Sequence, residues 1–242
     1  MGGGRHRAGR PGHGRRVKPP LARALVLDFG GVISKTLFET HDLTEQALGL
    51  PPCTLKWLGP FAPDTDPLWA SMQGGDISER DYWLTRSREV GHMLGEDWQA
   101  METFVQRARG ADPATVVRPE ADRAIRRVDD AGVKLAILSN ELDLFYGADF
   151  RRRLPFMAAF DVVVDATHTG ILKPDARAYR QCLDELGLPA EACVFVDDQL
   201  RNIAGAERVG LRCVHFDVMQ PAASYAQALA LLGIPSSSSQ RP

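Results

Sequence analysis

The chain has 242 residues, of which 44% are hydrophobic and 25% are charged, a length that suits one globular unit with an insertion or two small domains. No run approaches the roughly 18 to 20 apolar residues that a bilayer span needs, and the first apolar run, residues 24–27, is too short for a signal peptide. Membrane and secreted proteins are therefore not expected, and the sequence predicts a cytoplasmic protein.

The two ends of the chain are basic, whereas the part between them is acidic. Seven of the 29 lie in residues 1–20 and 235–242, which contain no acid, so residues 21–234 carry 22 basic residues against 31 acidic ones. We expect no nucleic acid partner, because phosphate backbones are bound by clustered lysines and arginines. Residues 1–20 contain too few apolar side chains to order themselves, so we expect a disordered basic tail there and a flexible tail at 235–242.

Four cysteines are scattered along the chain without a C-x-x-C pair: Cys53, Cys182, Cys193 and Cys213. Three of them lie in segments with the pattern of a buried helix or strand. The sequence therefore predicts reduced thiols and supports neither a disulfide framework nor a structural zinc site.

Short apolar runs alternate with segments of helical periodicity. The first run, residues 25–27, ends at Asp28 before a Gly-Gly pair, and four more follow at 134–138, 161–164, 193–196 and 212–216. Helices are expected at 119–131, 175–186 and 202–209, and a glycine closes each one. This alternation predicts a doubly wound, parallel α/β sheet whose ligand lies outside the carboxyl ends of the strands.

Residues 34–118 interrupt the alternation. They contain helical patterns at 37–48, 78–90 and 97–107 and no comparable strand run. We therefore expect an inserted α-helical cap over 34–118, a core of 21–33 and 119–234, and hinges near 33–35 and 112–118. The aromatic residues of the insert fit the core of a helical bundle better than a substrate platform; they are Trp57, Trp69, Tyr82, Trp83 and Trp98.

Polar residues follow successive strands of the predicted sheet. Asp28 follows the first, Ser139-Asn140 the second and Asp197-Asp198 the fourth, while the third leads into Lys173. Taken alone, the Ser139-Asn140 pair is also explained as a helix cap, and Lys173 as a solvated turn residue. Two adjacent acids among buried residues favour a cation. Together the four positions predict one cleft.

The segments Leu27-Asp28-Phe29-Gly30-Gly31-Val32, Ile137-Leu138-Ser139-Asn140, Leu172-Lys173-Pro174 and Val196-Asp197-Asp198-Gln199 resemble the four signature motifs of the haloacid dehalogenase-like hydrolase superfamily. Their spacings, 111, 34 and 24 residues from Asp28 through Ser139 and Lys173 to Asp197, suit a member with a helical cap between the first two motifs. Within the superfamily, the chain is most similar to the subgroup that holds sugar-1-phosphate phosphatases and the N-terminal phosphatase domain of soluble epoxide hydrolases. These proteins share the Asp-Asp-x-x-x-Asn-Ile/Leu pattern seen at residues 197–203.

This resemblance implies a Mg²⁺-dependent phosphohydrolase that acts on a small phosphorylated metabolite. Asp28 would be the nucleophile that forms an aspartyl-phosphate, Lys173 the neighbouring positive charge and Ser139 a hydroxyl donor to the phosphoryl group. The residues expected to bind substrate are Gly30, Gly31 and Asn140. The expected Mg²⁺ ligands are Asp28, the Gly30 carbonyl and Asp198, with Asp197 as a further or indirect ligand.

One position departs from the family pattern. Most phosphatases of the superfamily carry a second Asp two residues after the nucleophile, as general acid and base, where this chain has Gly30. The first interpretation is a phosphatase for good leaving groups, such as anomeric sugar, aryl or acyl phosphates. Glu39 and His41 are candidates for a substitute acid, although such residues are more often ordinary surface positions of a helix.

Two other interpretations stay open. A 2-haloacid dehalogenase attacks carbon with a similar Asp and no metal, but it lacks the acidic pair Asp197-Asp198. A non-catalytic binding module has no physical reason to keep buried charges at Asp28 and Lys173. Phe145, Tyr146 and the basic run 151–153 are candidates for the cleft edge or a homodimer contact, with a solvated face as the default for the basic run.

Overall fold

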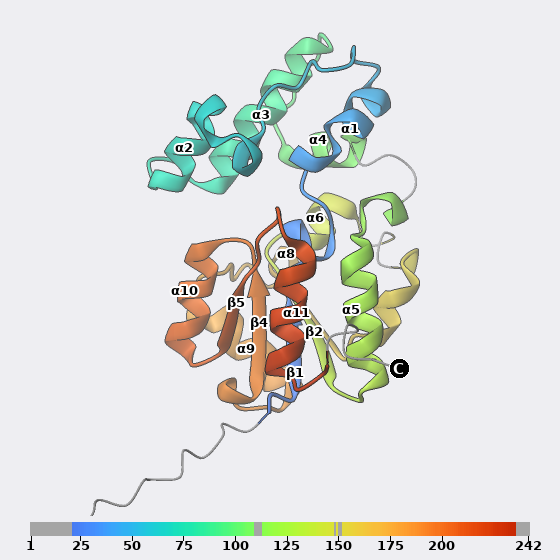
Figure 1. Ribbon diagram of the computed structural model, residues 1–242. Coiled ribbons are helices and arrows are strands. Elements are labelled where there is room, and N and C mark those ends of the chain that lie inside the picture. Colours follow the sequence, from blue (N-terminus) through green and yellow to red (C-terminus); the bar gives the residue numbers. More distant parts are fainter. Residues whose placement is uncertain (1–20, 109–112, 148, 150–151, 236–242) are drawn as a thin grey trace, which may run out of the picture.

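The computed structural model describes residues 21–108, 113–147, 149 and 152–235 (Figure 1). The predicted tails at 1–20 and 236–242 lie outside the described residues. Among the helices that are described, none combines the length and apolar character needed to cross a bilayer.

Five parallel strands form one sheet in the order β3-β2-β1-β4-β5, which confirms the predicted α/β architecture. The strands are β1 (Ala24–Leu27), β2 (Lys134–Ser139), β3 (Val162–Asp165), β4 (Cys193–Asp197) and β5 (Arg212–His215). The first strand is central and wholly buried. Its side chains alternate between the two faces, so Leu25 and Leu27 enter one apolar core and Val26 the other.

Helices cover both faces of the sheet. The helices α5 (Pro119–Asp130) and α11 (Pro221–Leu231) pack on the face of Leu25, and α9 (Ala176–Leu186) and α10 (Leu200–Val209) on the face of Val26. Two short helices, α6 (Leu142–Tyr146) and α8 (Ala166–Thr169), follow β2 and β3. The predicted helices of the core are therefore present, while α6, α8 and α11 were not predicted.

The insertion is helical, as predicted, and lies beyond the carboxyl ends of the strands (Figure 1). We call it the cap. It consists of α1 (His41–Leu48), α2 (Pro67–Gly74), α3 (Glu79–Met93) and α4 (Met101–Ala108). Two short 3₁₀ turns, Gly59–Phe61 and Pro63–Thr65, lie between α1 and α2. The cap has its own apolar core, which includes Trp57, Tyr82 and Phe104. Aromatic side chains thus hold the insert together as a unit.

Two cap helices differ from the expected bounds. The helix predicted at 97–107 begins only at Met101. The helix predicted at 37–48 is divided into a 3₁₀ turn at Phe38–Thr40 and α1. In that turn, the Glu39 carboxylate accepts hydrogen bonds from the backbone and hydroxyl of Thr36, at 2.8 and 2.9 Å. This local bonding competes with a regular first turn of the helix.

The two segments that join the cap to the core lie side by side. Ser34 and Val117 form an antiparallel bridge. The Lys35 amide donates to the Val116 carbonyl at 2.7 Å, and the Arg118 amide donates to the Ile33 carbonyl at 2.9 Å. The chain therefore leaves the core and returns to it at one point, within the two ranges expected as hinges; residue 112 lies outside the described residues.

Candidate active site

The predicted motif residues meet at one cavity. Asp28, Ser139, Lys173 and Asp198, which are separated by up to 170 residues, line a cavity of about 270 Å³ between the carboxyl edge of the sheet and the cap. Each follows or neighbours a different strand end, and parallel strands bring those ends to one edge. The expectation of a common cleft is confirmed.

Lys173 is the buried centre of this site. Its Nζ lies 2.8 Å from Asp28 Oδ1 and 2.7 Å from Asp197 Oδ2. The loop that carries it is held by Asn140, whose Nδ2 donates to the Lys173 carbonyl at 3.2 Å while its Oδ1 accepts from the Lys173 amide at 2.7 Å. Asn140 therefore positions the lysine, and substrate binding by this residue stays a prediction.

Asp197 is fully buried beside Lys173 and well connected. Its carboxylate accepts hydrogen bonds from the Gln199 amide at 2.8 Å and from Asn202 Nδ2 at 3.0 and 3.1 Å. These contacts fix the carboxylate that holds the lysine. Sequence reasoning did not single out Asn202, although it lies in the 197–203 pattern that carried the resemblance.

Three carboxylates gather where a cation was predicted. Asp28, Asp197 and Asp198 each offer an oxygen, and these oxygens lie within 4.8 Å of one another. One lysine is the neighbouring cation, so the cluster has an excess of negative charge. Hard oxygen ligands of this kind fit Mg²⁺, and the donor set therefore suits the predicted metal.

The pKa shifts of these side chains reflect the same excess of negative charge. Burial raises the pKa of Asp28 to about 7, helped by Asp197 and opposed by Lys173. Burial, Asp197 and Asp28 raise the pKa of Asp198 well above its usual value. Burial alone would lower the pKa of Lys173, but Asp197 and Asp28 outweigh it and raise that pKa. Both carboxylates therefore lack positive charge that a divalent cation would supply.

The two glycines after Asp28 both line the cavity but differ in their need to be glycine. Gly31 has φ +74°, and a Cβ there would lie 2.5 Å from Asp198 Oδ2. Gly30 has φ −67°, and a Cβ there would meet no atom within 4 Å. The backbone requires glycine only at position 31. The missing acid at position 30 is therefore not imposed by the fold.

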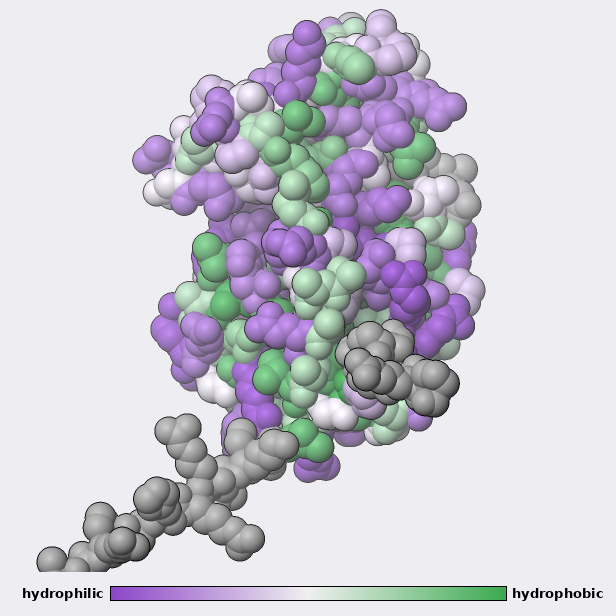
Figure 2. Space-filling model, in the orientation of Figure 1, coloured by the Kyte–Doolittle hydropathy of each residue, from purple (hydrophilic) through white to green (hydrophobic). Residues whose placement is uncertain are grey.

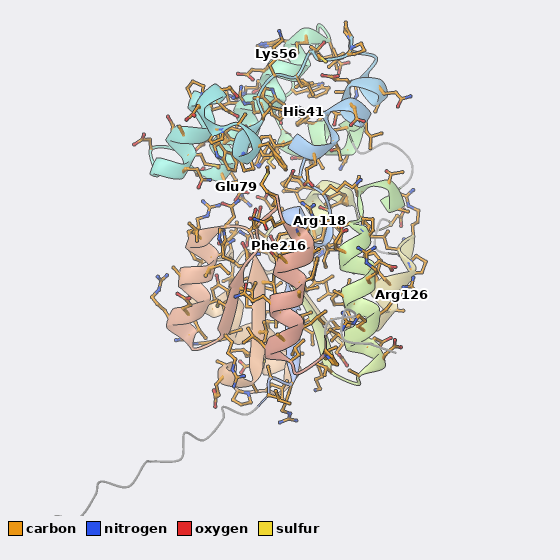
Figure 3. The ribbon with its side chains drawn as sticks, viewed as in Figure 1. His41, Lys56, Glu79, Arg118, Arg126 and Phe216 are labelled. Carbon is orange, nitrogen blue, oxygen red and sulfur yellow. The ribbon has the colours of Figure 1, made fainter. Side chains whose placement is uncertain are left out.

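Neither candidate for a substitute acid lines the cavity. Both carboxylate oxygens of Glu39 are bound by the Arg118 guanidinium, at 2.6 and 2.5 Å. His41 lies inside the cap, where its ring packs edge-on against Trp57 with centroids 4.3 Å apart (Figure 3). The structure assigns Glu39 to the hinge and His41 to the cap core, instead of the surface position that was the default for both.

Glu79 is the cap acid that does face the core. It lies at the first turn of α3, lines the cavity and points toward the sheet in Figure 3. Its carboxylate forms an ion pair with Arg201 of α10, and the next cap residue, Arg80, pairs with Glu141 of the core at 2.6 Å. Burial raises the pKa of Glu79, opposed by Arg201. Sequence reasoning missed both pairs because their partners are far away in the chain.

The aromatic residues of the insert divide between two roles. Trp57, Tyr82 and Trp98 are buried in the cap, as predicted, whereas Trp69 and Trp83 also line the cavity. Phe145 and Tyr146 line the cavity as well, which agrees with the cleft edge, one of the two alternatives left open for them. Residues 152 and 153 of the basic run are exposed, and residue 151 lies outside the described residues.

Comparison with known proteins agrees with this geometry. A model of the haloacid dehalogenase-like hydrolase family matches residues 22–210. The chain belongs to this family. The resemblance to the superfamily that its four motifs carried is thereby confirmed.

Two relatives illustrate the range of the family. The chain is 34% identical over 118 residues to Acyl-CoA dehydrogenase family member 10 of Mus musculus, over 48% of this chain and 11% of that protein. It is 29% identical over 148 residues to Phosphatase MT3486 of Mycobacterium tuberculosis, over 61% of this chain and 64% of that protein. The chain therefore spans less than two thirds of the length of either relative.

Two solved structures share the fold. The hydrolase YfnB of Bacillus subtilis, determined with bound magnesium, has a TM-score of 0.65 at 15% identity and covers 89% of this chain and all of its own. A mutant of CbbY from Rhodobacter sphaeroides, determined with xylulose-(1,5)bisphosphate, has a TM-score of 0.51 at 20% identity and covers 80% of this chain and 85% of its own. At these identities the likeness concerns the fold alone.

Proposed function

We propose that this hydrolase is a Mg²⁺-dependent phosphatase that acts on a small phosphorylated molecule through a phosphorylated Asp28. One observation carries the proposal: Lys173 bridges Asp28 and Asp197 at the floor of a cavity that Asp198 also lines. A nucleophile, a fixed positive charge and a carboxylate site for a cation therefore lie at one point. Phosphoryl transfer needs this combination, because its barrier is mostly positional and electrostatic.

In the first step, an oxygen of Asp28 forms a bond to phosphorus while the bond from phosphorus to the leaving oxygen breaks. Lys173 holds Asp28 in place from one side, and Ser139 donates its hydroxyl to a phosphoryl oxygen. In the second step, the oxygen of a water bonds to phosphorus, the bond from phosphorus to Asp28 breaks with its electron pair returning to the carboxylate, and inorganic phosphate leaves with the protons of the water. A divalent cation held by Asp28, Asp198 and the Gly30 carbonyl would neutralise charge on the phosphoryl group.

Relatives and neighbours support the substrate class. One relative is named a phosphatase, and a neighbour in fold was solved with a phosphorylated sugar. We also propose that the chain belongs to the subgroup that holds sugar-1-phosphate phosphatases and epoxide hydrolase N-terminal domains, because of the pattern at 197–203. This assignment concerns the subgroup and leaves the organic part of the substrate open. The acidic pair Asp197-Asp198 speaks against the dehalogenase alternative, and the buried ion pairs of Lys173 speak against a vestigial site.

The first test compares hydrolysis of p-nitrophenyl phosphate and of 2-chloropropionate, each with Mg²⁺ and with EDTA. We expect phosphate release only with Mg²⁺. Chloride release that ignores EDTA would assign the protein to the dehalogenases and overturn the proposal.

A variant tests the nucleophile directly. Asp28→Asn should abolish turnover, by a factor of at least about 10³, because an amide is not a competent nucleophile. The exposed Asp42→Asn in α1 is the matched control and should keep full turnover. Both variants should show the wild-type circular dichroism spectrum, and full activity of Asp28→Asn would contradict the mechanism.

A further inference from the structure

The wall of the cavity that faces the catalytic floor is apolar. Six of its residues carry the argument: Leu37, Phe38, Trp69 and Trp83 from the cap, and Phe145 and Tyr146 from the core. Outside the cavity, the face of the molecule in Figure 2 mixes hydrophobic and hydrophilic residues. The six apolar residues named above all line the cavity.

These rings are held by one another. The Phe38 ring lies 5.2 Å from Trp69 and 5.1 Å from Trp83, measured between centroids. Tyr146 packs against Phe29 at 5.3 Å, and its hydroxyl lies 3.3 Å from Ser34 Oγ at the hinge. The wall is thus a packed surface that keeps its shape, which favours a flat apolar group of the substrate.

Four polar side chains on the cap side of the cavity already have protein partners. Thr36 donates its hydroxyl to Glu39 at 2.9 Å, and Ser78 donates its hydroxyl to Asp81 at 2.6 Å. Glu79 and Arg80 form the two ion pairs with the core. A sugar held here would have to compete for these four side chains, and burying unbonded hydroxyl groups is costly.

Resting on the proposed phosphatase function, we propose that the substrate is an aryl phosphate, a phosphate ester of an apolar phenol. Its ring packs on the wall of Phe38, Trp69, Trp83 and Phe145, and its phosphoryl group reaches Asp28. When the Asp28 oxygen bonds to phosphorus, the electron pair of the broken bond passes to the phenol oxygen.

The aromatic ring delocalises that charge, so the phenolate leaves without a proton. Gly30 supplies no proton to the leaving oxygen. The open space beside it shows that the backbone does not require glycine at this position. The apolar wall and the missing acid are separate features, and both fit the same leaving group. Water then releases phosphate from Asp28 as in the proposed mechanism.

The test measures kcat/KM with Mg²⁺ for 2-naphthyl, phenyl and acetyl phosphate and for glucose 1-phosphate. We expect 2-naphthyl phosphate to exceed phenyl phosphate by about tenfold, because it buries a second ring, and both to exceed glucose 1-phosphate by at least about 100-fold. If acetyl phosphate is hydrolysed but glucose 1-phosphate matches the aryl esters, the phosphatase function stands and the aryl proposal fails. If none of the four is hydrolysed, the proposed function itself fails, and the aryl proposal with it.

Trp83→Ala tests the wall within the same experiment. The ratio of kcat/KM for 2-naphthyl over acetyl phosphate should fall about tenfold, while Met93→Ala, an apolar truncation at an exposed cap position, should keep the wild-type ratio. Phe145→Ala in α6 is the second variant should Trp83→Ala unfold the cap. Binding gives an independent readout: 2-naphthylmethylphosphonate should bind at least about tenfold more tightly than methylphosphonate in calorimetry, and equal affinities would overturn the proposal.

Discussion

Gly30 and Gly31 are adjacent, yet side chains at the two positions would have opposite consequences. At Gly31 a Cβ would collide with the Asp198 carboxylate, and the φ of +74° adds strain for any other residue. At Gly30 the backbone is extended and the space beside it is open. The chemistry of the site therefore depends on a choice of residue that the fold leaves unconstrained.

Gly30→Asp should fold like the wild type and gain activity on poor leaving groups. A carboxyl group at this position can protonate the leaving oxygen, and a placed acid is worth about 10²- to 10⁴-fold in rate. The measurement is kcat/KM for an n-alkyl phosphate relative to an aryl phosphate, with Gly30→Asn as the control that adds bulk without the acid. An unchanged ratio in Gly30→Asp would show that another group supplies the proton.

His41 predicts a pH effect on stability. Burial in the cap lowers its pKa from 6.5, opposed by Glu45 and Asp42 and helped by Arg86, so the unfolded chain binds the proton more readily than the folded one. Stability is therefore full above about pH 6.5 and falls as the pH drops below it. Thermal melts between pH 7.5 and 5 should show a smaller decline for His41→Phe than for the wild type. His92→Phe, at an exposed position of α3, should decline like the wild type.

The residues proposed for catalysis and metal binding could be located from the sequence because they lie at strand ends, and the strand ends of a parallel sheet converge. Asp28, Ser139 and Asp198 illustrate this. Arg118 and Glu79 could not be located in the same way. Their partners, Gly31 with Glu39 and Arg201, lie up to 122 residues away and depend on how the cap sits on the core.

At the scale of elements, Arg118 connects the cap, its hinge and the turn that follows β1. Its guanidinium donates to the Gly31 carbonyl at 3.1 Å and binds both oxygens of Glu39, and its side chain is only 3% exposed. It also lies over the Phe216 ring, at 5.5 Å from the centroid. One buried cation thus fixes the turn after β1 relative to the first residues of the cap.

Glu39→Gln should destabilise the protein by about 2 to 4 kcal/mol, because it leaves the buried Arg118 without its anion. Urea unfolding monitored by circular dichroism measures the change. Glu120→Gln breaks the exposed pair with Arg123 in α5 and should cost less than about 1 kcal/mol. Equal losses in the two variants would show that the Arg118 pair has no special place in the hinge.

At the scale of the whole molecule, the sequence predicted a sheet covered by helices but not the order of the strands in the sheet. Apolar runs and terminal glycines identified the strands and three core helices, whereas the order β3-β2-β1-β4-β5 depends on long-range pairing. The short helix α6 escaped notice because five residues carry little periodicity. The helical nature of the insert was predictable, but its packing on α6 was not, since that contact joins α4 to a helix 34 residues further on.

Metal binding should be visible in the stability of the whole chain. A cation that binds the folded carboxylate cluster stabilises it by about 2.7 kcal/mol at 100 times its Kd, which corresponds to a rise in Tm of roughly 5 to 10 °C for a chain of this size. Mg²⁺ should therefore raise Tm relative to EDTA. Asp198→Asn should lose the shift and Asp42→Asn should keep it, whereas a Tm that ignores Mg²⁺ in the wild type would contradict a metal site.

The bridge between Ser34 and Val117 has a consequence for how such proteins diversify. Because exit and re-entry of the chain share one point, the segment between them can be exchanged as one unit while the five strands stay in place, provided that the new segment supplies the buried Arg118 with an anion, as Glu39 does. Mutation, or a protein engineer, can exchange the walls around the reacting phosphorus without touching the groups that react. Changes in the cap can therefore alter substrate selectivity independently of the residues at the strand ends, which are proposed to carry the chemistry.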